Sequence, residues 1–321
     1  MNPVAVSVII PVRDDPRVFR AVESVLACAG EAASLQVIVV DNGSPPAFAE
    51  DLRTRFGGDV ELMEVAAPGV YGARNRGIEA SNGDVIFFTD ADCLIRPGWI
   101  AAGLETIAAG ADIAQGYSGS LGDSPVRRLI QLRYEAHLRR LAPGDPTECD
   151  TRNLAVHRRV FETIRFEEGY RRVGDTEFGL CAEVAGFRVG YQPRMRVDHE
   201  HEDDLPLFAA KQVCHGWGAQ RLMQQHPEVE WHGGHLKAVS RVSKRLAPRA
   251  GMNLIARACS RGSVWNAALL QRCAGRLPVA VGFWWLTGID KLAALGGHLA
   301  YLPGSPEPSP SEVLGRRLPR D

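Results

Sequence analysis

The chain has 321 residues, of which 45% are hydrophobic and 23% charged, and its formal net charge at pH 7 is −1. These values indicate an ordinary globular protein with one large α/β domain, or one domain and an appendage. Seven cysteines without a C-x-x-C pair suggest neither a disulfide framework nor a zinc ribbon, and they favour a reducing cytoplasm.

The chain begins with a strand–helix–strand pattern. Residues 6–11 predict a buried strand and not a signal peptide, since no basic region precedes the short apolar run. Apolar residues at a helical period predict a helix over 17–29, and residues 35–40 predict a second buried strand. This succession implies a parallel sheet with right-handed crossovers. No G-x-G-x-x-G follows the first strand, so a dinucleotide site is not expected.

Asp41 ends the second predicted strand. Its carboxylate could accept the N3–H of a uracil, or it could form an Asx-turn leading into the next helix. Residues 61–65 predict a short third strand, and a glycine-punctuated turn over 68–81 runs into a helix. Backbone N–H groups at that helix start, with Arg74 and Arg76 beside them, predict either an anion site or a solvated helix face.

Asp90 and Asp92 follow an apolar run at 85–88 that predicts a strand buried on both faces. Ligands bind at the carboxyl edge of an open α/β sheet, where two carboxylates could hold a divalent cation and leave positions for phosphate oxygens. The pair could equally be a helix-capping turn, since residues 97–99 turn the chain into a new helix. The surrounding motifs decide between these interpretations.

Four segments carry a family resemblance: Val6–Val12, Val39–Ser44, Gly72–Gly77 and Phe88–Asp92. In order and spacing they resemble family 2 glycosyltransferases with the GT-A fold, over residues 4 to about 200. The resemblance implies an α/β, Rossmann-like and mostly parallel sheet flanked by helices. It also implies inverting transfer of a sugar from a nucleotide diphosphate donor, usually a UDP-sugar, with Mg²⁺ or Mn²⁺ as cofactor.

The same resemblance assigns roles by position. Asp41 would hold the base, Arg74 would contact the nucleotide, and Asp90 and Asp92 would form the metal motif, with Pro11 and Asp90 also at the nucleotide. The implied partners are a nucleotide-sugar donor and a saccharide acceptor, and no nucleic acid is expected. A lipid-linked acceptor of the cell envelope is a hypothesis that rests on the basic C-terminal part of the chain.

In the second half, residues 111–120 predict a strand and 127–141 a polar amphipathic helix. Residues 149–161 resemble the family's segment near the acceptor site, and Asn153 is expected to line that site. A further strand is predicted over 189–193.

Asp175 lies in a segment that looks like the family's acidic motif at a helix start. A carboxylate fixed there can take the proton of the attacking hydroxyl, and we assign that role to Asp175. The family usually has two adjacent acids, whereas this chain has Gly174, so Glu177 stays open as the base or as a helper. The alternative is a capping box with Asp175 as the N-cap.

Residues 197–204 hold seven side chains that can bind metals within eight positions. In many related enzymes a histidine after the last core strand joins the Asp-x-Asp motif on the metal, and His199 or His201 fits that place. Alternate residues of an extended segment face the same way, so both histidines could point at one site. A solvated acidic loop is the alternative.

A helix predicted over 205–225 resembles only loosely the Q-x-x-R-W motif of processive family members, because His215 stands where arginine is expected. Single sugar addition is therefore favoured over polymerisation.

The C-terminal part is basic. Residues 231–289 contain nine Lys or Arg and no Asp or Glu, whereas residues 1–230 carry a net charge of −10. The asymmetry indicates an anionic surface or ligand. Apolar runs at 277–289 and 292–302 are shorter than the roughly 20 residues of a spanning helix. They predict either a helical hairpin packed on the protein or an amphipathic patch on a membrane.

We therefore predict a glycosyltransferase domain over 1–230, a basic and apolar helical module over 231–302 and a disordered tail over 303–321. The protein is expected in the cytoplasm, with peripheral attachment to the inner face of the cytoplasmic membrane left open. One alternative is a sugar nucleotidyltransferase, which would need a glycine-rich loop that residues 11–16 lack. The other is a non-catalytic carbohydrate- or lipid-binding protein on the same fold, against which the retained acids argue.

Overall fold

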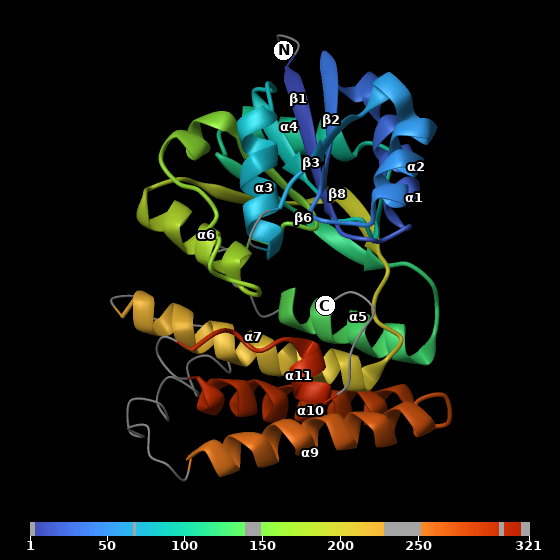
Figure 1. Ribbon diagram of the computed structural model, residues 1–321, viewed down its shortest axis with the longest axis vertical. Helices are drawn as coiled ribbons and strands as arrows, with labels where there is room; N and C mark the ends of the chain where they lie inside the picture. Colours follow the sequence, from blue (N-terminus) through green and yellow to red (C-terminus); the bar gives the residue numbers. More distant parts are fainter. Residues whose placement is uncertain (1–3, 67–68, 139–148, 228–251, 302–304, 316–321) are drawn as a thin grey trace. The chain divides into compact units, whose positions relative to one another are not determined.

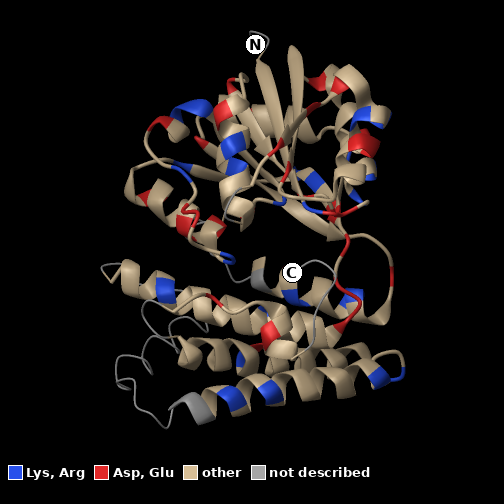
Figure 2. Ribbon diagram, viewed as in Figure 1, with Lys and Arg blue, Asp and Glu red and all other residues tan. Residues whose placement is uncertain are grey.

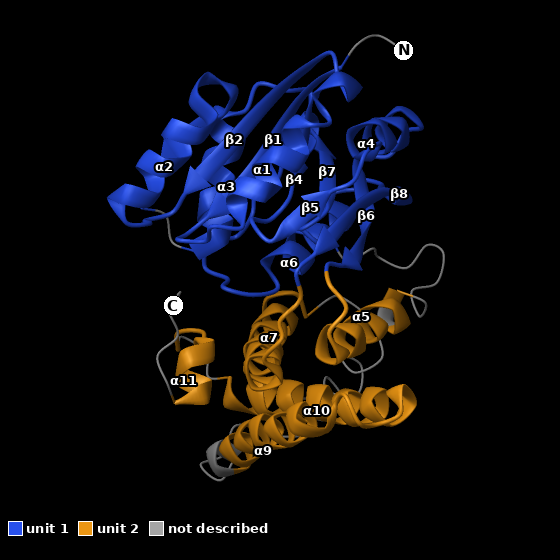
Figure 3. Cartoon of the chain, turned by 90° about the vertical axis from the view of Figure 1, so that its right-hand side faces the viewer, with its two compact units in different colours: residues 1–121, 143–200 blue, residues 122–142, 201–321 orange. Residues whose placement is uncertain are grey.

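The computed structural model describes residues 4–66, 69–138, 149–227, 252–301 and 305–315. The chain divides into two compact units, residues 1–121 with 143–200 and residues 122–142 with 201–321 (Figure 3). The strands are β1 Ala5–Val12, β2 Ser34–Asp41, β3 Glu61–Glu64, β4 Val85–Phe88, β5 Cys93–Ile95, β6 Ile113–Ser120, β7 Leu154–His157 and β8 Val189–His199. The α-helices are α1 Val18–Leu26, α2 Pro46–Phe56, α3 Gly69–Ala80, α4 Trp99–Ala108, α5 Pro125–Leu138, α6 Gly174–Val184, α7 Leu205–Gln225, α9 Met252–Cys273, α10 Val279–Ala300 and α11 Pro310–Leu314.

The first unit is built on one sheet with the strand order β3-β2-β1-β4-β7-β6-β8-β5 (Figure 1). Strands β3, β2, β1 and β4 are parallel to one another. Strand β7 runs antiparallel to both β4 and β6, while β6 and β8 are parallel and β5 runs antiparallel to β8. The predicted α/β class is confirmed, and the sheet is mixed in its second half.

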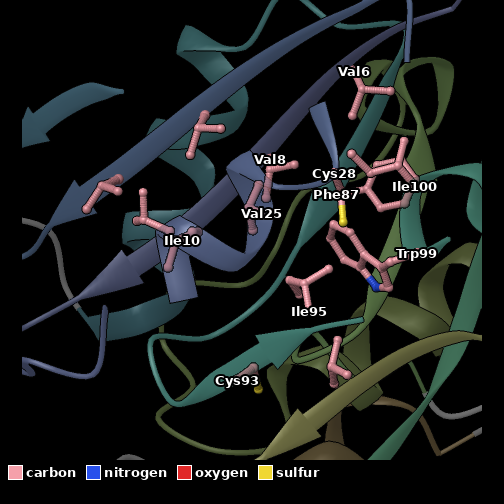
Figure 4. Close-up of a cluster of buried hydrophobic side chains, with 14 of the residues drawn as sticks. Val6, Val8, Ile10, Val25, Cys28, Phe87, Cys93, Ile95, Trp99 and Ile100 are labelled. Carbon is pink, nitrogen blue, oxygen red and sulfur yellow. The ribbon is translucent and has the colours of Figure 1, made fainter. Parts of the chain in front are cut away.

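Side chains of β1 alternate between two helical layers, as the period of a strand requires. Val8 and Ile10 point into the cluster of Figure 4, which also holds Val25 of α1 and Trp99 of α4. Ile9 points the other way, toward α3, where a Cβ on Gly77 would lie 2.6 Å from Ile9 Cγ2. Helices therefore cover both faces of the sheet. The edge at which the strands end is left as the place for a site.

An aromatic cluster holds α6 against the sheet. Phe88 of β4 packs edge-to-face on Phe166 with ring centroids 5.5 Å apart, and Phe166 lies 4.5 Å from Phe178 of α6. All three rings are buried. Because Phe178 is three residues after Asp175, this packing fixes the first turn of α6 relative to the end of β4.

The second unit is helical. Helices α5, α7, α9 and α10 share a buried apolar cluster that includes Leu129, Phe208, Leu270 and Leu286. Helices α9 and α10 pack closely and run antiparallel. A Cβ on Gly262 would meet Leu292, and a Cβ on Gly296 would meet Ser260. The two predicted apolar runs belong to the single helix α10. None of the helices in the described ranges is long and apolar enough to cross a membrane.

Two of the predicted boundaries differ from the structure. The predicted boundary at residue 230 does not coincide with the division into units, because α7 packs against α9 and α10. The tail from 303 was expected to be disordered, yet it contains α11, whose first turn is closed by a capping box of Ser309 and Glu312. Residues 228–251 of the predicted basic module lie outside the described residues.

Candidate active site

The carboxyl ends of β1, β2 and β4 meet at one edge of the sheet because these strands are parallel. Val12 pairs with Asp41 at the ends of β1 and β2, and the backbone N–H of Asn42 donates to the carbonyl of Val12 at 2.8 Å. Strand β4 ends at Phe88, two residues before Asp90. Asp41 and the Asp-x-Asp motif therefore follow strands that end at the same edge, as the strand pattern predicts.

Asp41 is buried, at 2% exposure. Its Oδ1 accepts from the backbone N–H of Ser44 at 3.0 Å and from Ser44 Oγ at 2.5 Å, so the Asx-turn before α2 is present. Pro11 is buried in β1, opposite Val40. The contact of Asp41 and Pro11 with a nucleotide stays a prediction, and it would use the second carboxylate oxygen of Asp41.

Arg74 is the counter-ion of Asp90. The Arg74 side chain lies on α3, is 3% exposed, and donates from Nη2 to Asp90 Oδ1 at 2.6 Å. Its guanidinium also lies 5.4 Å from the centre of the Tyr71 ring. Burial raises the pKa of Asp90, and the charge of Arg74 opposes that rise. The predicted contact of Arg74 with the nucleotide would therefore be made by a group that already organises the Asp-x-Asp motif.

Asp92 meets His199 because of the register between β5 and β8. Cys93 pairs with His199 in that register, so Asp92 lies beside the end of β8, and its Oδ2 is 3.5 Å from His199 Nε2. Arg17, at the start of α1, brings Nη2 to 3.6 Å from the same oxygen. Burial favours a higher pKa for Asp92, but His199 and Arg17 outweigh burial and lower it.

His201 does not share this arrangement. Strand β8 ends at His199, so the alternation that would have aligned the two histidines stops before His201. His201 belongs to the second unit, where its ring Nε2 lies 2.8 Å from Gln131 Oε1 on α5. The strand alternation that would align the two histidines is absent, and His199 is the one whose ring lies beside Asp92.

Two arginines at this site were given no role by the sequence analysis. Arg152 forms a two-pronged pair with Asp150, with Nε at 2.9 and 3.0 Å from the two carboxylate oxygens, and its Nη1 lies 3.3 Å from His199 Nδ1. A guanidinium can only donate, so Nδ1 accepts and the ring proton is assigned to Nε2, which faces Asp92. Arg152 lowers the pKa of Asp150, against the opposing effect of burial.

A local signal could have identified both arginines. Arg17 and Arg152 each stand two residues after an aspartate, in Asp15-Pro16-Arg17 and Asp150-Thr151-Arg152. In each case the backbone N–H of the arginine donates to the Oδ1 of that aspartate at 3.1 Å, and the guanidinium closes on the same carboxylate. The repeated Asp-x-Arg pattern thus marks a turn that fixes the arginine.

Asp175 is held by Tyr71. The Tyr71 hydroxyl lies 3.2 Å from Asp175 Oδ1 and accepts from the backbone N–H of Gly174 at 3.0 Å. Burial, reinforced by the charge of Asp150, raises the pKa of Asp175 to about 6. Helix α6 begins at Gly174 with Val173 as N-cap, so the alternative that Asp175 is the N-cap is wrong.

Two other predicted site residues are directed into the protein. Glu177 is 8% exposed and accepts from Cys181 Sγ at 3.0 Å, one turn along α6. Asn153 is fully buried, and its side chain bonds to Trp99 Nε1 at 2.7 Å and to the Tyr117 carbonyl at 2.8 Å. The expectation that Asn153 lines an acceptor site is wrong, because it is a buried link between α4 and the sheet.

The group of Asp90, Asp92 and His199 has the chemistry of a divalent-cation site. Carboxylate oxygens with one imidazole suit Mn²⁺, and carboxylates suit Mg²⁺. Asp92 Oδ2 and His199 Nε2 are 3.5 Å apart, close to the separation of about 3 Å between neighbouring ligands of an octahedral ion. Asp90 would have to share its carboxylate between the cation and Arg74. To bind the cation through Nε2, His199 would have to release Nδ1 from Arg152 and move its ring proton there from Nε2.

Comparison with known proteins shows the family of the chain. The family described as Glycosyl transferase family 2 matches residues 7–188. The chain is 29% identical over 235 residues to the pre-mycofactocin glycosyltransferase of Mycobacterium tuberculosis, which covers 70% of this chain and 48% of that protein. It is 26% identical over 207 residues to the succinoglycan biosynthesis protein ExoM of Rhizobium meliloti, covering 61% of this chain and 67% of that protein.

Among solved structures, the mannosyltransferase PcManGT from Pyrobaculum calidifontis, in complex with GDP-Man and Mn²⁺, superposes with a TM-score of 0.61 and 17% identity. The match covers 94% of this chain and 88% of that one, and it shows a shared fold. The chain spans about half the length of the mycobacterial relative.

Proposed function

The chain belongs to glycosyl transferase family 2, and on that basis we propose that it transfers a sugar from a nucleotide diphosphate donor to a hydroxyl acceptor with inversion at the anomeric carbon. The observation that carries the proposal is the meeting of Asp92 with His199 across β5 and β8. An Asp-x-Asp motif alone is a frequent pattern. A histidine that lies beside the motif, although more than a hundred residues away in the sequence, supports its assignment as a metal ligand set.

In the proposed reaction the residues divide into three tasks. Asp41 and Pro11 would receive the base. Asp90, Asp92 and His199 would hold Mg²⁺ or Mn²⁺, which would supply Lewis-acid stabilisation of the leaving diphosphate. Asp175 accepts the proton of the attacking hydroxyl, since a carboxylate with a pKa of about 6 is ionised at neutral pH yet basic enough to hold a proton.

Tyr71 positions this base. Its hydroxyl bridges the Gly174 N–H and Asp175 Oδ1, which fixes one carboxylate oxygen and leaves the other for the acceptor. Glu177, turned toward Cys181, is the weaker candidate for the base.

For the substrates we propose a UDP-sugar donor and a saccharide or lipid-linked glycan of the cell envelope as acceptor, with a single sugar added. The acceptor class is supported by the relative named for succinoglycan biosynthesis. The donor rests on Asp41, whose carboxylate suits the N3–H of uracil. The structural neighbour holds GDP-Man, so guanine is the base to test against uracil.

The deciding experiment is calorimetric titration of UDP and of GDP, with and without Mn²⁺, into the wild type and into Asp92→Asn. The matched control is Asp51→Asn, an exposed aspartate on α2. We expect UDP to bind only with Mn²⁺, and this binding to be lost in Asp92→Asn and retained in Asp51→Asn. UDP-sugars are then tested for release of UDP with an envelope-glycan acceptor.

The other outcomes separate the alternatives. Binding of GDP in place of UDP would keep the transferase proposal and reject the assignment of the base. Metal-dependent binding without turnover of any donor would favour a non-catalytic protein on this fold. If neither nucleotide binds to the folded wild type, the proposed function is wrong.

A further inference from the structure

Helices α9 and α10 of the second unit expose large apolar side chains to solvent. Trp284 is 70% exposed, Trp265 67%, Val281 49% and Leu269 37%. Tryptophan is costly to leave in water, and clusters of such residues mark surfaces that bind something. We call Trp265, Leu269, Val281 and Trp284 the apolar strip.

The spacing of these residues places each pair on the outer face of its helix. Trp265 and Leu269 are four residues apart on α9, and Val281 and Trp284 are three apart on α10. Residues at these spacings are neighbours on a helix surface. The inward faces carry the buried Leu270 of α9 and Leu286 of α10.

The two outer faces adjoin. Helices α9 and α10 are antiparallel, as the approaches of Gly262 to Leu292 and of Gly296 to Ser260 require, so Leu269 and Trp284 stand at a similar height along the pair. A shallow groove between the helices is lined by Asn266 of α9 and by Trp284, Trp285, Gly288, Ile289 and Leu292 of α10. The apolar strip therefore runs across both helices.

Basic side chains border the strip. Arg257, Arg261 and Arg272 are exposed on α9, and Arg261 lies four residues before Trp265 on the same face. Lys291 is exposed on α10, seven residues after Trp284 and thus on its face. Figure 2 shows basic and no acidic residues along α9.

No acidic group balances this charge among the described residues of the two helices. The acidic residue of α10, Asp290, is buried and paired with Arg133 of α5 at 2.8 Å. The neighbouring sequence is also positively charged, since residues 231–289 contain nine Lys or Arg and no Asp or Glu. The surface thus combines exposed tryptophans with unbalanced positive charge, which is the composition of helices that lie in the headgroup layer of an anionic membrane.

We propose that the outer face of α9 and α10 is a docking surface for an anionic lipid bilayer. The tryptophans and Leu269 would enter the interface, and the arginines would contact lipid phosphates. The attachment would be peripheral, and it requires neither donor nor metal, so it is tested independently of the proposed transferase activity.

The test is flotation of the full chain with vesicles of phosphatidylcholine alone, or of phosphatidylcholine with about one-third phosphatidylglycerol, at low and high salt. We expect binding to the anionic vesicles only, weakened by salt. The triple variant Arg257→Gln, Arg261→Gln, Arg272→Gln is expected to bind on the order of 100-fold more weakly, since each charge near an anionic surface contributes about fivefold.

The double variant Trp265→Ser, Trp284→Ser tests the apolar component, and it should weaken binding even at low salt. Controls on the first unit are Arg20→Gln on α1 and Val184→Ser on α6, both exposed, which should bind as the wild type does. Circular dichroism verifies that every variant is folded.

Three results would overturn the proposal. The folded wild type could fail to bind anionic vesicles at low salt. Binding could be the same in all variants. The wild type could fail to bind vesicles and sediment as a dimer, while the double tryptophan variant sediments as a monomer. In that case the strip joins two copies of this chain.

Discussion

The raised pKa of Asp175 makes a strong prediction about stability as well as activity. In the folded protein the pKa of this carboxyl is about 6, against an ordinary value of 3.8. Between these two values the native state binds more protons than the unfolded state, so stability falls as the pH rises through this window. A shift of about two units corresponds to about 3 kcal/mol. At pH 8, ionised Asp175 therefore destabilises the fold by up to about 3 kcal/mol.

Asp175→Asn removes this ionisation while keeping the shape of the side chain. We expect the variant to be more stable than the wild type at pH 8, by up to about 3 kcal/mol. Any weakening of the hydrogen bond from the Thr176 N–H reduces this gain. The gain should shrink as the pH falls toward 4, where the folded wild type is protonated. Urea unfolding in metal-free buffer at several pH values measures it.

The same substitution should lower the rate of sugar transfer by about 10²- to 10⁴-fold, because no group then accepts the proton. A variant that is both inactive and more stable is the signature of a group kept for function at a cost in stability. If Asp175→Asn is less stable than the wild type at pH 8, burial is not raising the pKa of this group and the reasoning fails. Asp150→Asn is the companion variant. Because the charge of Asp150 helps to raise the pKa of Asp175, the stability gained through Asp175→Asn should be smaller in the Asp150→Asn background.

Two further predictions concern the backbone and the cation. In Gly83→Ala the new Cβ would lie within 2.6 Å of the backbone of β1. Thermal unfolding should therefore show a loss of stability of about 1–3 kcal/mol or more. Gly30→Ala is the control and should be close to neutral, because a Cβ there would have nothing within 4 Å. Arg152→Gln should bind Mn²⁺ more tightly than Arg17→Gln in titrations without nucleotide. Each loses one positive charge, but only the former releases His199 Nδ1, so that the ring can carry its proton there and offer Nε2 to the cation. Equal affinities would show that the tautomer of His199 does not matter.

Much of the site could be predicted because it rests on local patterns. Strands β1, β2 and β4 are continuous apolar runs, and parallel strands must deliver their carboxyl ends to one edge. That rule brings Asp41 and Asp90 to the same edge, and the family resemblance of the surrounding segments assigns their roles. Helix α7 has the ends predicted from the sequence, and the structure shows Asp204 as its N-cap, accepting from the Leu207 N–H at 2.9 Å.

What could not be predicted depends on pairing between distant segments. Strand β5 has three residues, too few to show a period, yet its register with β8 decides which histidine meets Asp92. His201 has the same composition context as His199 but lies beyond the strand end. Asn153 was placed at the acceptor by the family resemblance of its segment, but its amide satisfies buried partners on two sides, a pairing between distant residues that the segment alone does not show.

The charges at the site also order the binding events. Five carboxylates, those of Asp15, Asp90, Asp92, Asp150 and Asp175, lie among three guanidinium groups, those of Arg17, Arg74 and Arg152. With all of them ionised, the cluster has a net charge of −2. Such a cluster attracts a divalent cation and repels a free diphosphate, since charges of one sign in a poorly hydrated site raise the energy of adding another. A nucleotide diphosphate should therefore bind with the cation or after it. Arg74, which is closed on Asp90, and Arg17, which lies 3.6 Å from Asp92, are the groups available to turn toward the phosphates once the cation has taken those carboxylates.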